Sequence, residues 1–296
     1  MEPLANNVFD CALVFEGGGY RGAYTAGIAN ALLENELLFD YVCGISAGAS
    51  HTLNYVSRDQ NRVKLSFMAL DGSEPVGGLG TLLHGKGYFN ADYLYEGCIA
   101  DGFAPFDWDT FVANPARIRI QAFERDSGRT VTFGKADMPN VWEAIKRVRA
   151  SSTIPGAMKP EPVDGVVLFD GGLGEGAGLP TPMAAHDGFE RYLLVATRVE
   201  GYRKRQFPPA VRLAVKRVFA AYPEVVNALL SRAERYNQEL DHVRELERAG
   251  QALVIRPDTM PVRNTTLDTT ELEQAYQLGH EQGLRETDRI RAFVRA

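Results

Sequence analysis

The sequence predicts an α/β fold in which a mainly parallel sheet is covered by helices on both faces. Residues 11–15 form a short, continuous apolar run, which is typical of a strand buried on both faces. Apolar residues then recur at helical spacing from Ala23 to Leu37, and a second apolar run occupies residues 39–45. A further helix is expected to open at Ala47. Strands and helices that alternate in this order indicate parallel strands joined by helices.

The rest of the chain continues the pattern. Residues 71–87, with six glycines and Pro75, predict a long surface loop. The later elements are expected as hairpin strands at 117–124 and 130–133, a helix at 141–150, strands at 163–169, 192–196 and 252–255, and helices at roughly 208–221, 223–249 and 269–294. Because the strand at 252–255 is expected in the same sheet, we predict one domain over residues 1–296, with a catalytic region at about 11–200 and a mostly helical region at about 201–296.

Composition and charge narrow the class of protein. The 296 residues are 45% hydrophobic and 24% charged, as in a folded globular protein. The formal net charge of −6 argues against nucleic-acid binding, which needs an electropositive face. No signal-peptide pattern and no apolar run of about 18 residues is visible, and the three cysteines Cys11, Cys43 and Cys98 fit reduced thiols. We therefore expect a cytoplasmic protein.

Residues 44–48 have the form G-x-S-x-G, with Ser46 between Gly44 and Gly48. A nucleophilic serine between a strand and a helix needs a strained turn that exposes its hydroxyl, and small residues on either side let the strand and the helix approach closely. The position of the motif, directly after an apolar strand and before a helix, supports this interpretation. The helix N-terminus beside Ser46 also favours developing negative charge.

A glycine-rich loop, G-G-G-Y-R-G at residues 17–22, follows the first strand. Successive glycines expose backbone N–H groups, so such a loop can form an oxyanion hole. The loop also fits the dinucleotide-binding pattern G-x-G-x-x-G. That alternative requires an acidic residue at the end of the second strand, where the chain has Ser46 instead, and Asp40 lies at the wrong end. The sequence therefore favours an esterase over a nucleotide-binding protein.

The general base is expected to be an aspartate. Asp170 closes an apolar strand and is followed by Gly171 and Gly172, which puts it at a sheet edge suited to catalysis. A simple Asp-Gly turn is the structural alternative. None of the five histidines, His51, His84, His186, His242 and His280, stands in a recognisable catalytic context. The serine motif also comes earlier in the chain than in α/β-hydrolases.

With these motifs the chain resembles the patatin-like phospholipase family. The loop at 17–22 with its basic residue Arg21, the serine motif at 44–48 and the Asp170-Gly171-Gly172 box occur in the family's order, and residues 150–156 are similar to the segment that the family carries before its aspartate. The resemblance covers roughly residues 11–200. It implies a three-layer α/β/α fold, a Ser46–Asp170 dyad and an oxyanion hole formed by the loop that contains Gly17, Gly18, Gly19, Arg21 and Gly22.

The function that this resemblance implies is hydrolysis of lipid acyl esters, with release of a fatty acid and without a metal or cofactor. The expected partners are a lipid or acyl-ester substrate and, transiently, a membrane surface. Two alternatives remain: a non-catalytic lipid- or acyl-binding protein on the same fold, and a nucleotide-binding oxidoreductase. The sequence does not determine the head group, the acyl chain length, the positional preference or the oligomeric state.

Two further expectations concern the surroundings of Ser46. Residues 71–90, with apolar Leu79, Leu82 and Leu83, are expected to form a rim over Ser46, although a plain surface loop has the same pattern. Arg21 is expected to brace the oxyanion loop. The basic run Arg203-Lys204-Arg205 is interpreted as a solvated face rather than as a contact with anionic lipid.

Overall fold

The structure is a computed structural model that describes residues 4–68 and 72–295. In these residues the strands form one sheet in the order β5-β6-β3-β2-β1-β7-β8, with β4 paired to β3. The strands are β1 (Ala12–Phe15), β2 (Tyr41–Ile45), β3 (Arg117–Glu124), β4 (Thr130–Phe133), β5 (Pro162–Val163), β6 (Val166–Asp170), β7 (Tyr192–Val195) and β8 (Ala252–Ile255). The strand expected at 252–255 does join this sheet, because β8 pairs in parallel with β7.

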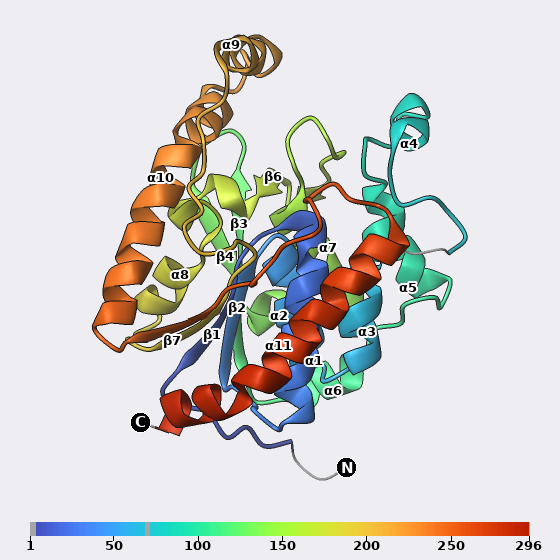
Figure 1. Cartoon of the computed structure of the whole chain (residues 1–296). Helices are drawn as coiled ribbons and strands as arrows, with labels where there is room; N and C mark the ends of the chain where they lie inside the picture. Colours follow the sequence, from blue (N-terminus) through green and yellow to red (C-terminus); the bar gives the residue numbers. More distant parts are fainter. Residues whose placement is uncertain (1–3, 69–71, 296) are drawn as a thin grey trace.

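Helices cover both faces of the sheet, so the predicted three-layer α/β/α fold is confirmed (Figure 1). The helices are α1 (Gly22–Glu34), α2 (Ala47–Val56), α3 (Gln60–Leu65), α4 (Leu79–Leu83), α5 (Cys98–Ala100), α6 (Trp108–Ala113), α7 (Val141–Ser152), α8 (Thr181–His186), α9 (Pro209–Val218), α10 (Pro223–Arg248) and α11 (Thr269–Arg295), with a π-helical turn at Asp92–Gly97. Helices α1, α2 and α11 lie on one face, whereas α8 and α10 lie on the other (Figure 1).

The continuous apolar run of β1 is explained by these two helical layers. Leu13 and Phe15 belong to the core under α1 and α2, whereas Ala12 and Val14 belong to the core on the opposite face. Successive side chains of a strand point to opposite faces, so a strand between two helical layers needs an apolar residue at every position.

The C-terminal helix α11 packs directly on α1. A Cβ built on Gly279 would lie 2.0 Å from the carbonyl oxygen of Tyr24, and one on Gly27 would lie 2.2 Å from that of Tyr276. The two helices therefore meet at a distance that only glycine permits. The hydroxyl of Tyr24 donates a hydrogen bond to Gln282 at 2.8 Å, which ties the end of the chain to the first helix.

The antiparallel arrangement of β6 differs from what the position of Asp170 suggested. We expected Asp170 at the carboxyl edge of the sheet because it ends a strand. This reasoning applies only to a strand that runs parallel to its neighbours. Strand β6 runs antiparallel to β3 and pairs with its last residues, Ala122 with Asp170 and Glu124 with Leu168. The last residue of β2, Ile45, pairs with Gln121, so β3 extends beyond the end of β2. Because Asp170 pairs with Ala122, the next residue of β3, the end of β6 still reaches the level of Ser46.

Between α2 and β3 the chain has more helix than expected. Short helices α3 and α6 begin where the side chains of Asp59 and Asp107 accept hydrogen bonds from the backbone N–H groups of Arg62 and Thr110. Within the predicted loop at 71–87, α4 forms, and Gly77 bridges to Phe89. Residue 71, the first of the predicted rim, lies outside the described residues. No helix in the described ranges is both long and apolar enough to cross a membrane.

Candidate active site

Ser46 adopts the strained turn that its motif predicts. It has φ 58° and ψ −121° between β2 and α2, a conformation that residues other than glycine rarely adopt. A Cβ built on Gly48 would lie 2.1 Å from the carbonyl oxygen of Phe15, and one on Gly44 would lie 2.1 Å from the carbonyl oxygen of Gly48. The two flanking glycines therefore let the strand and the helix meet closely, as predicted.

The glycine-rich loop lies beside Ser46. A Cβ built on Gly17 would lie 3.4 Å from Cβ of Ser46. The N–H of Gly17 donates to the carbonyl of Gly178 at 3.0 Å, and the N–H of Arg21 donates to the carbonyl of Gly18 at 3.3 Å. The N–H of Gly22 is likewise bonded within the loop. Among the described residues, only the N–H groups of Gly18 and Gly19 in this loop have no acceptor.

The residues that follow Asp170 pack against the ends of β3 and β2. Gly171 turns over β3, and a Cβ built there would lie 2.2 Å from the carbonyl oxygen of Gln121 and 3.0 Å from Cγ2 of Ile45. Oδ1 of Asp170 accepts a hydrogen bond from the N–H of Gly172 at 2.7 Å. Ser46 is 7% exposed and Asp170 is 6% exposed, so both are largely shielded from solvent.

Residues 151–153 bind the backbone N–H groups of both Ser46 and Asp170. The hydroxyl of Ser151 accepts a hydrogen bond from the N–H of Ser46 at 2.9 Å. Two residues later, the carbonyl of Thr153 accepts one from the N–H of Asp170 at 2.8 Å. No hydrogen bond joins the Ser46 hydroxyl to the Asp170 carboxylate in the described part of the chain. Catalytic hydrogen bonds are often long in unliganded enzymes and tighten when substrate binds.

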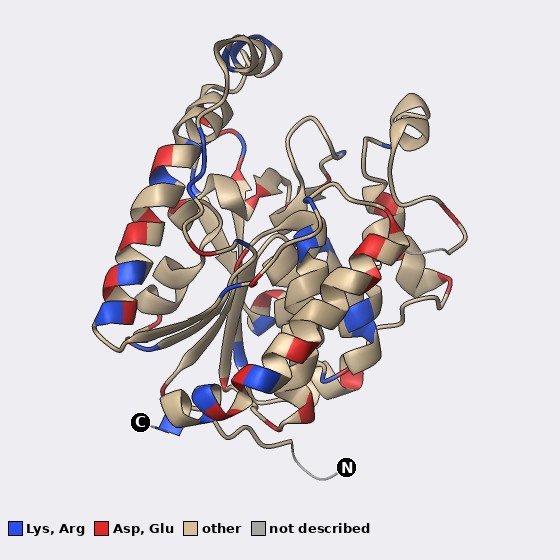
Figure 2. Ribbon diagram, viewed as in Figure 1, with Lys and Arg blue, Asp and Glu red and all other residues tan. Residues whose placement is uncertain are grey.

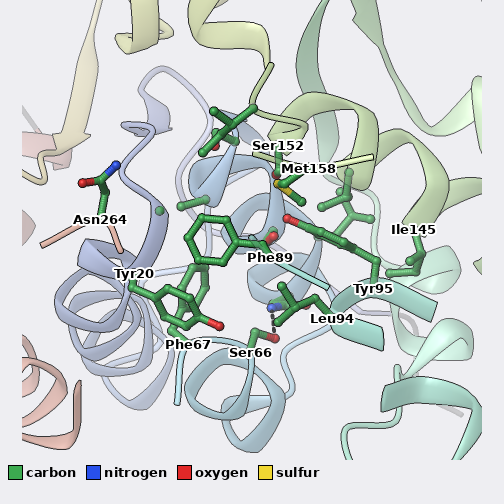
Figure 3. Close-up of a pocket in the computed structure, with 18 of the residues that line it drawn as sticks. Tyr20, Ser66, Phe67, Phe89, Leu94, Tyr95, Ile145, Ser152, Met158 and Asn264 are labelled. Atoms are coloured by element: carbon green, nitrogen blue, oxygen red, sulfur yellow. Dashed lines mark hydrogen bonds between the residues drawn. The ribbon is translucent and has the colours of Figure 1, made fainter. Parts of the chain in front are cut away.

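A cavity of about 90 Å³ opens beside Ser46. Its wall is mostly apolar, and Figure 3 shows Phe67, Phe89 and Leu94 around it. The cavity is smaller than the roughly 150 Å³ cavity that binds benzene in an engineered protein, so a long chain would have to extend beyond it or move its wall. Burial raises the pKa of Tyr95, and the nearby charge of Asp170 raises it further, so this lining phenol stays neutral. Asp170 is not among the lining residues.

Comparison with known families agrees with this geometry. The model of the patatin-like phospholipase family matches residues 13–184. The chain belongs to this family. Residues 222–295 match a second family, described as a domain of unknown function (DUF6363). Ser46, Asp170 and the glycine-rich loop lie within the patatin-like match, whereas the whole of α10 and α11 lies within the second.

Among curated proteins, the chain is similar to the uncharacterised protein YjjU of Escherichia coli K12, with 26% identity over 197 residues. The match covers 63% of this chain and 51% of YjjU, so the chain spans about half the length of that relative. Among solved structures it is similar to VipD from Legionella pneumophila (13% identity, TM-score 0.46, 94% of this chain and 67% of that one). It is also similar to human GIVD cytosolic phospholipase A2 in complex with methyl gamma-linolenyl fluorophosphonate (12% identity, TM-score 0.49, 97% and 59%).

No histidine of this patatin-like chain lines the cavity at Ser46 within the described ranges. His51 is fully buried on α2, where its Nε2 lies 2.7 Å from the Thr25 hydroxyl and 3.0 Å from the carbonyl oxygen of Gly22. Burial lowers the pKa of His51 to about 3, so it remains neutral. His186 lies on the surface next to Glu175, and His280 pairs with Glu34.

Bracing of the oxyanion loop by the Arg21 side chain stays a prediction. Its guanidinium is buried, with 7% of the residue exposed, and it forms no hydrogen bond or ion pair with any described residue. The loop is held by Asn264, whose carbonyl accepts the N–H of Tyr20 at 3.2 Å. Asn264 lies far away in the sequence, and no local pattern identified it.

Two other supporting residues were also not predicted. The buried side-chain amide of Gln121 donates to the carbonyls of Gly171 and Glu175 at 2.7 and 2.9 Å. Arg235 on α10 donates to the carbonyls of Leu173 and Gly174. Both hold the segment that follows Asp170. Gln121 had no sequence signal, because it occurs once in a strand of ordinary pattern.

Proposed function

We propose that this chain hydrolyses acyl esters of lipids, with Ser46 as nucleophile and Asp170 as general base. The observation that carries the proposal is the backbone of Ser46, at φ 58° and ψ −121°, which opens on a mostly apolar cavity next to the unpaired N–H groups of Gly18 and Gly19. Backbone strain of this kind is retained where the chemistry needs it. Membership of the patatin-like phospholipase family supports lipid hydrolase activity.

The mechanism begins with transfer of the Ser46 hydroxyl proton to Asp170 while Oγ bonds to the ester carbonyl carbon. The N–H groups of Gly18 and Gly19 stabilise the resulting oxyanion. The intermediate then collapses, the alcohol leaves with the proton held by Asp170, and the acyl group stays on Ser46. Asp170 next deprotonates a water molecule, which attacks the acyl-enzyme, releases the fatty acid and regenerates Ser46. No metal or cofactor takes part.

A fluorophosphonate probe with mass spectrometry tests the assignment. We expect the probe to label Ser46 in the wild type, and we expect no labelling in Ser46→Ala. Turnover of p-nitrophenyl esters should be almost abolished by Ser46→Ala and by Asp170→Asn. The double variant should be little worse than either single one, because residues that act as a unit are not additive. An unlabelled wild type would favour the alternative of a non-catalytic acyl-binding protein.

The histidines provide the control. His84, His186 and His242 are exposed, and His280 is half-buried. Replacing each with glutamine should leave most of the activity. One such change, for instance His186→Gln, could instead lower kcat by three orders of magnitude without unfolding the protein. That result would contradict the dyad and indicate a histidine triad.

We further propose that the enzyme works on an anionic membrane surface through α9. This helix projects from the rest of the molecule (Figure 1). It exposes Val211, Leu213 and Val218, the last of these by 69%. It also carries Arg212, Lys216 and Arg217 and no acidic residue (Figure 2). An exposed helix with apolar and basic residues has the composition of an interfacial helix on anionic lipid.

The rim helix α4 rises at the same end of the molecule as α9 (Figure 1). Its Leu79, Leu82 and Leu83 are exposed, Leu83 by 86%. We propose that both helices contact the lipid surface, α9 by charge and apolar insertion and α4 by apolar insertion. We also propose that the chain acts in the cytoplasm, where its three unpaired cysteines fit a reducing compartment.

Vesicle co-sedimentation of the Ser46→Ala protein tests the contact through α9. Binding to vesicles with phosphatidylglycerol should exceed binding to vesicles of phosphatidylcholine alone. The triple change Arg212→Gln, Lys216→Gln and Arg217→Gln should weaken binding by about 3 kcal/mol, or roughly 150-fold, at about 1 kcal/mol per basic residue. Equal binding of the triple variant and its parent would exclude α9 as the contact.

A further inference from the structure

Four basic side chains gather near one another, and we call them the basic cluster: Arg21, Arg198, Lys204 and Arg232. Arg21 comes from the glycine-rich loop, Arg198 and Lys204 from the segment after β7, and Arg232 from α10. Among the described residues, no carboxylate lies within ion-pair distance of any of them. Other buried basic side chains do have such partners, for example Arg147 with Glu143.

The carboxylate in the middle of the basic cluster is already engaged. Glu16 is 2% exposed. Its Oε1 accepts a hydrogen bond from the Tyr236 hydroxyl, and its Oε2 accepts one from the N–H of Thr197, both at 2.6 Å. Arg21 and Lys204 therefore lie near a carboxylate whose two oxygens already have hydrogen-bond partners. Positive charge that is largely buried and unpaired is costly, which points to a missing anion.

Aromatic rings hold the basic cluster in place. The ammonium of Lys204 lies 4.6 Å from the ring centre of Tyr236, and the guanidinium of Arg198 lies 4.1 Å from that of Tyr202. The two tyrosine rings meet edge to face at 6.1 Å. Stacking on rings fixes the cations and leaves their N–H groups free to donate.

Burial and the close approach of these basic groups lower the pKa of two of them. Burial and the nearby Arg198 lower the pKa of Arg21 to about 10. Burial and the nearby Arg232 lower the pKa of Lys204 to about 7. Lys204 was interpreted from the sequence as part of a solvated basic run, and that interpretation was wrong, because it is half-buried among these neighbours. Only Arg203 and Arg205 of the run are exposed.

Arg232 connects the basic cluster to Asp170, and the cluster is distinct from the apolar cavity. A Cβ built on Gly172 would lie 2.3 Å from Nη2 of Arg232 and 2.8 Å from Oδ1 of Asp170. Nε of Arg232 donates to the carbonyl of Ala177 at 3.2 Å, which aims the guanidinium along the aspartate box. None of the four residues lines the cavity beside Ser46. The site thus has an apolar pocket and a separate cationic side.

We propose that the basic cluster binds the phosphate of the substrate's head group and selects lipids with a phosphomonoester head group, of the phosphatidate or lysophosphatidate class. This inference rests on the proposed function. A phosphomonoester carries a charge of about −1.5 to −2 at pH 7 and offers three acceptor oxygens, which match guanidinium groups. Choline and ethanolamine head groups have a weaker negative charge and a cation that these residues would repel.

A comparison of substrates with the same acyl chains tests the selection. In neutral detergent micelles, kcat/KM for phosphatidate should exceed that for phosphatidylcholine by about tenfold or more, the equivalent of about 1.4 kcal/mol. Lys204→Gln and Arg232→Gln should each reduce the ratio of kcat/KM for phosphatidate to that for p-nitrophenyl butyrate by about tenfold. Arg205→Gln is the matched control, since Arg205 is exposed and lies outside the basic cluster, and it should leave this ratio unchanged.

Binding to the inactive Ser46→Ala protein separates failure of this inference from failure of the proposed function. Monomeric dihexanoyl phosphatidate should raise the Tm of the Ser46→Ala protein, and dihexanoyl phosphatidylcholine should not. Lys204→Gln should remove the shift. If inorganic phosphate alone gives the whole shift, the basic cluster binds a free anion and not a lipid head group. Equal shifts for both lipids would overturn the inference, even if Ser46 proves to be the nucleophile.

Discussion

The hydrogen bond between Ser151 and Ser46 offers the sharpest test of how the fold positions the nucleophile. The Ser151 hydroxyl is fully buried and accepts the N–H of Ser46 at 2.9 Å. Ser151→Ala leaves that buried N–H without its hydrogen-bond acceptor. An unsatisfied buried group of this kind costs about 1–3 kcal/mol. In a chain of this size the Tm should fall by about 2–4 °C for each kcal/mol.

Ser151→Ala should also lower the catalytic rate, because the backbone of Ser46 is itself strained. Its φ of 58° with ψ of −121° costs about 1–3 kcal/mol and persists only while neighbours hold it. Without the Ser151 acceptor the turn can relax and the hydroxyl can move. We expect kcat to fall by up to about 100-fold with little change in KM, since a misplacement of about 1 Å has effects of this size. The rate of fluorophosphonate labelling should fall in parallel.

Ser152→Ala is the matched control for stability. It makes the same chemical change one residue later, but the Ser152 hydroxyl is buried without a hydrogen-bond partner among the described residues. Thermal unfolding of both variants should therefore show a clear loss for Ser151→Ala and almost none for Ser152→Ala. If Ser151→Ala retains the Tm and the kcat of the wild type, the hydrogen bond does not position Ser46 and the reasoning fails.

Three further predictions follow from other contacts. Gly48→Ala should destabilise the protein by about 3 kcal/mol or more in a denaturant titration, because its Cβ would lie 2.1 Å from the Phe15 carbonyl oxygen. Gly80→Ala is the control: its Cβ would have nothing within 4 Å, so the change should be neutral or slightly stabilising in the same titration. His51 has a folded-state pKa of about 3 against about 6.5 when unfolded, so the unfolded chain binds the extra proton and stability is lost as the pH falls from about 6.5. Between pH 7 and 5 the wild type should lose up to about 2 kcal/mol more than His51→Gln, and equal losses would contradict the burial of a neutral imidazole. Leu82→Asp with Leu83→Asp should lower kcat/KM for long-chain esters in micelles about tenfold more than for p-nitrophenyl butyrate; parallel losses would show that α4 is only a surface feature.

Local patterns were sufficient for much of this molecule. The strands around β1 and β2, the hairpin of β3 and β4 and the long C-terminal helices lie close to their predicted positions. The same holds for the strained turn at Ser46. These features depend on spacing, on apolar runs and on glycines next to each other in the chain, so a sequence carries them directly.

Pairing and register depended on the tertiary structure. Asp170 reaches the level of Ser46 because β6 runs antiparallel along the protruding end of β3, which no local pattern encodes. Likewise, Gly17 was predicted as an oxyanion donor, yet its N–H is bonded to Gly178 far along the chain. Which backbone groups remain free is decided only when distant segments meet.

The sequence by itself determined the alternation of strands and helices, the motifs at 17–22, 44–48 and 170–172, and with them the family. The tertiary structure decided which of these groups are free to act and what surrounds them. It brought Ser151 to Ser46, Asn264 to the glycine-rich loop, and Arg21, Arg198 and Lys204 together with Arg232, which lies next to Asp170. The physical reason is that hydrogen bonds and charge interactions act over a few ångströms in space, whereas these residues are separated by tens to hundreds of positions in the chain.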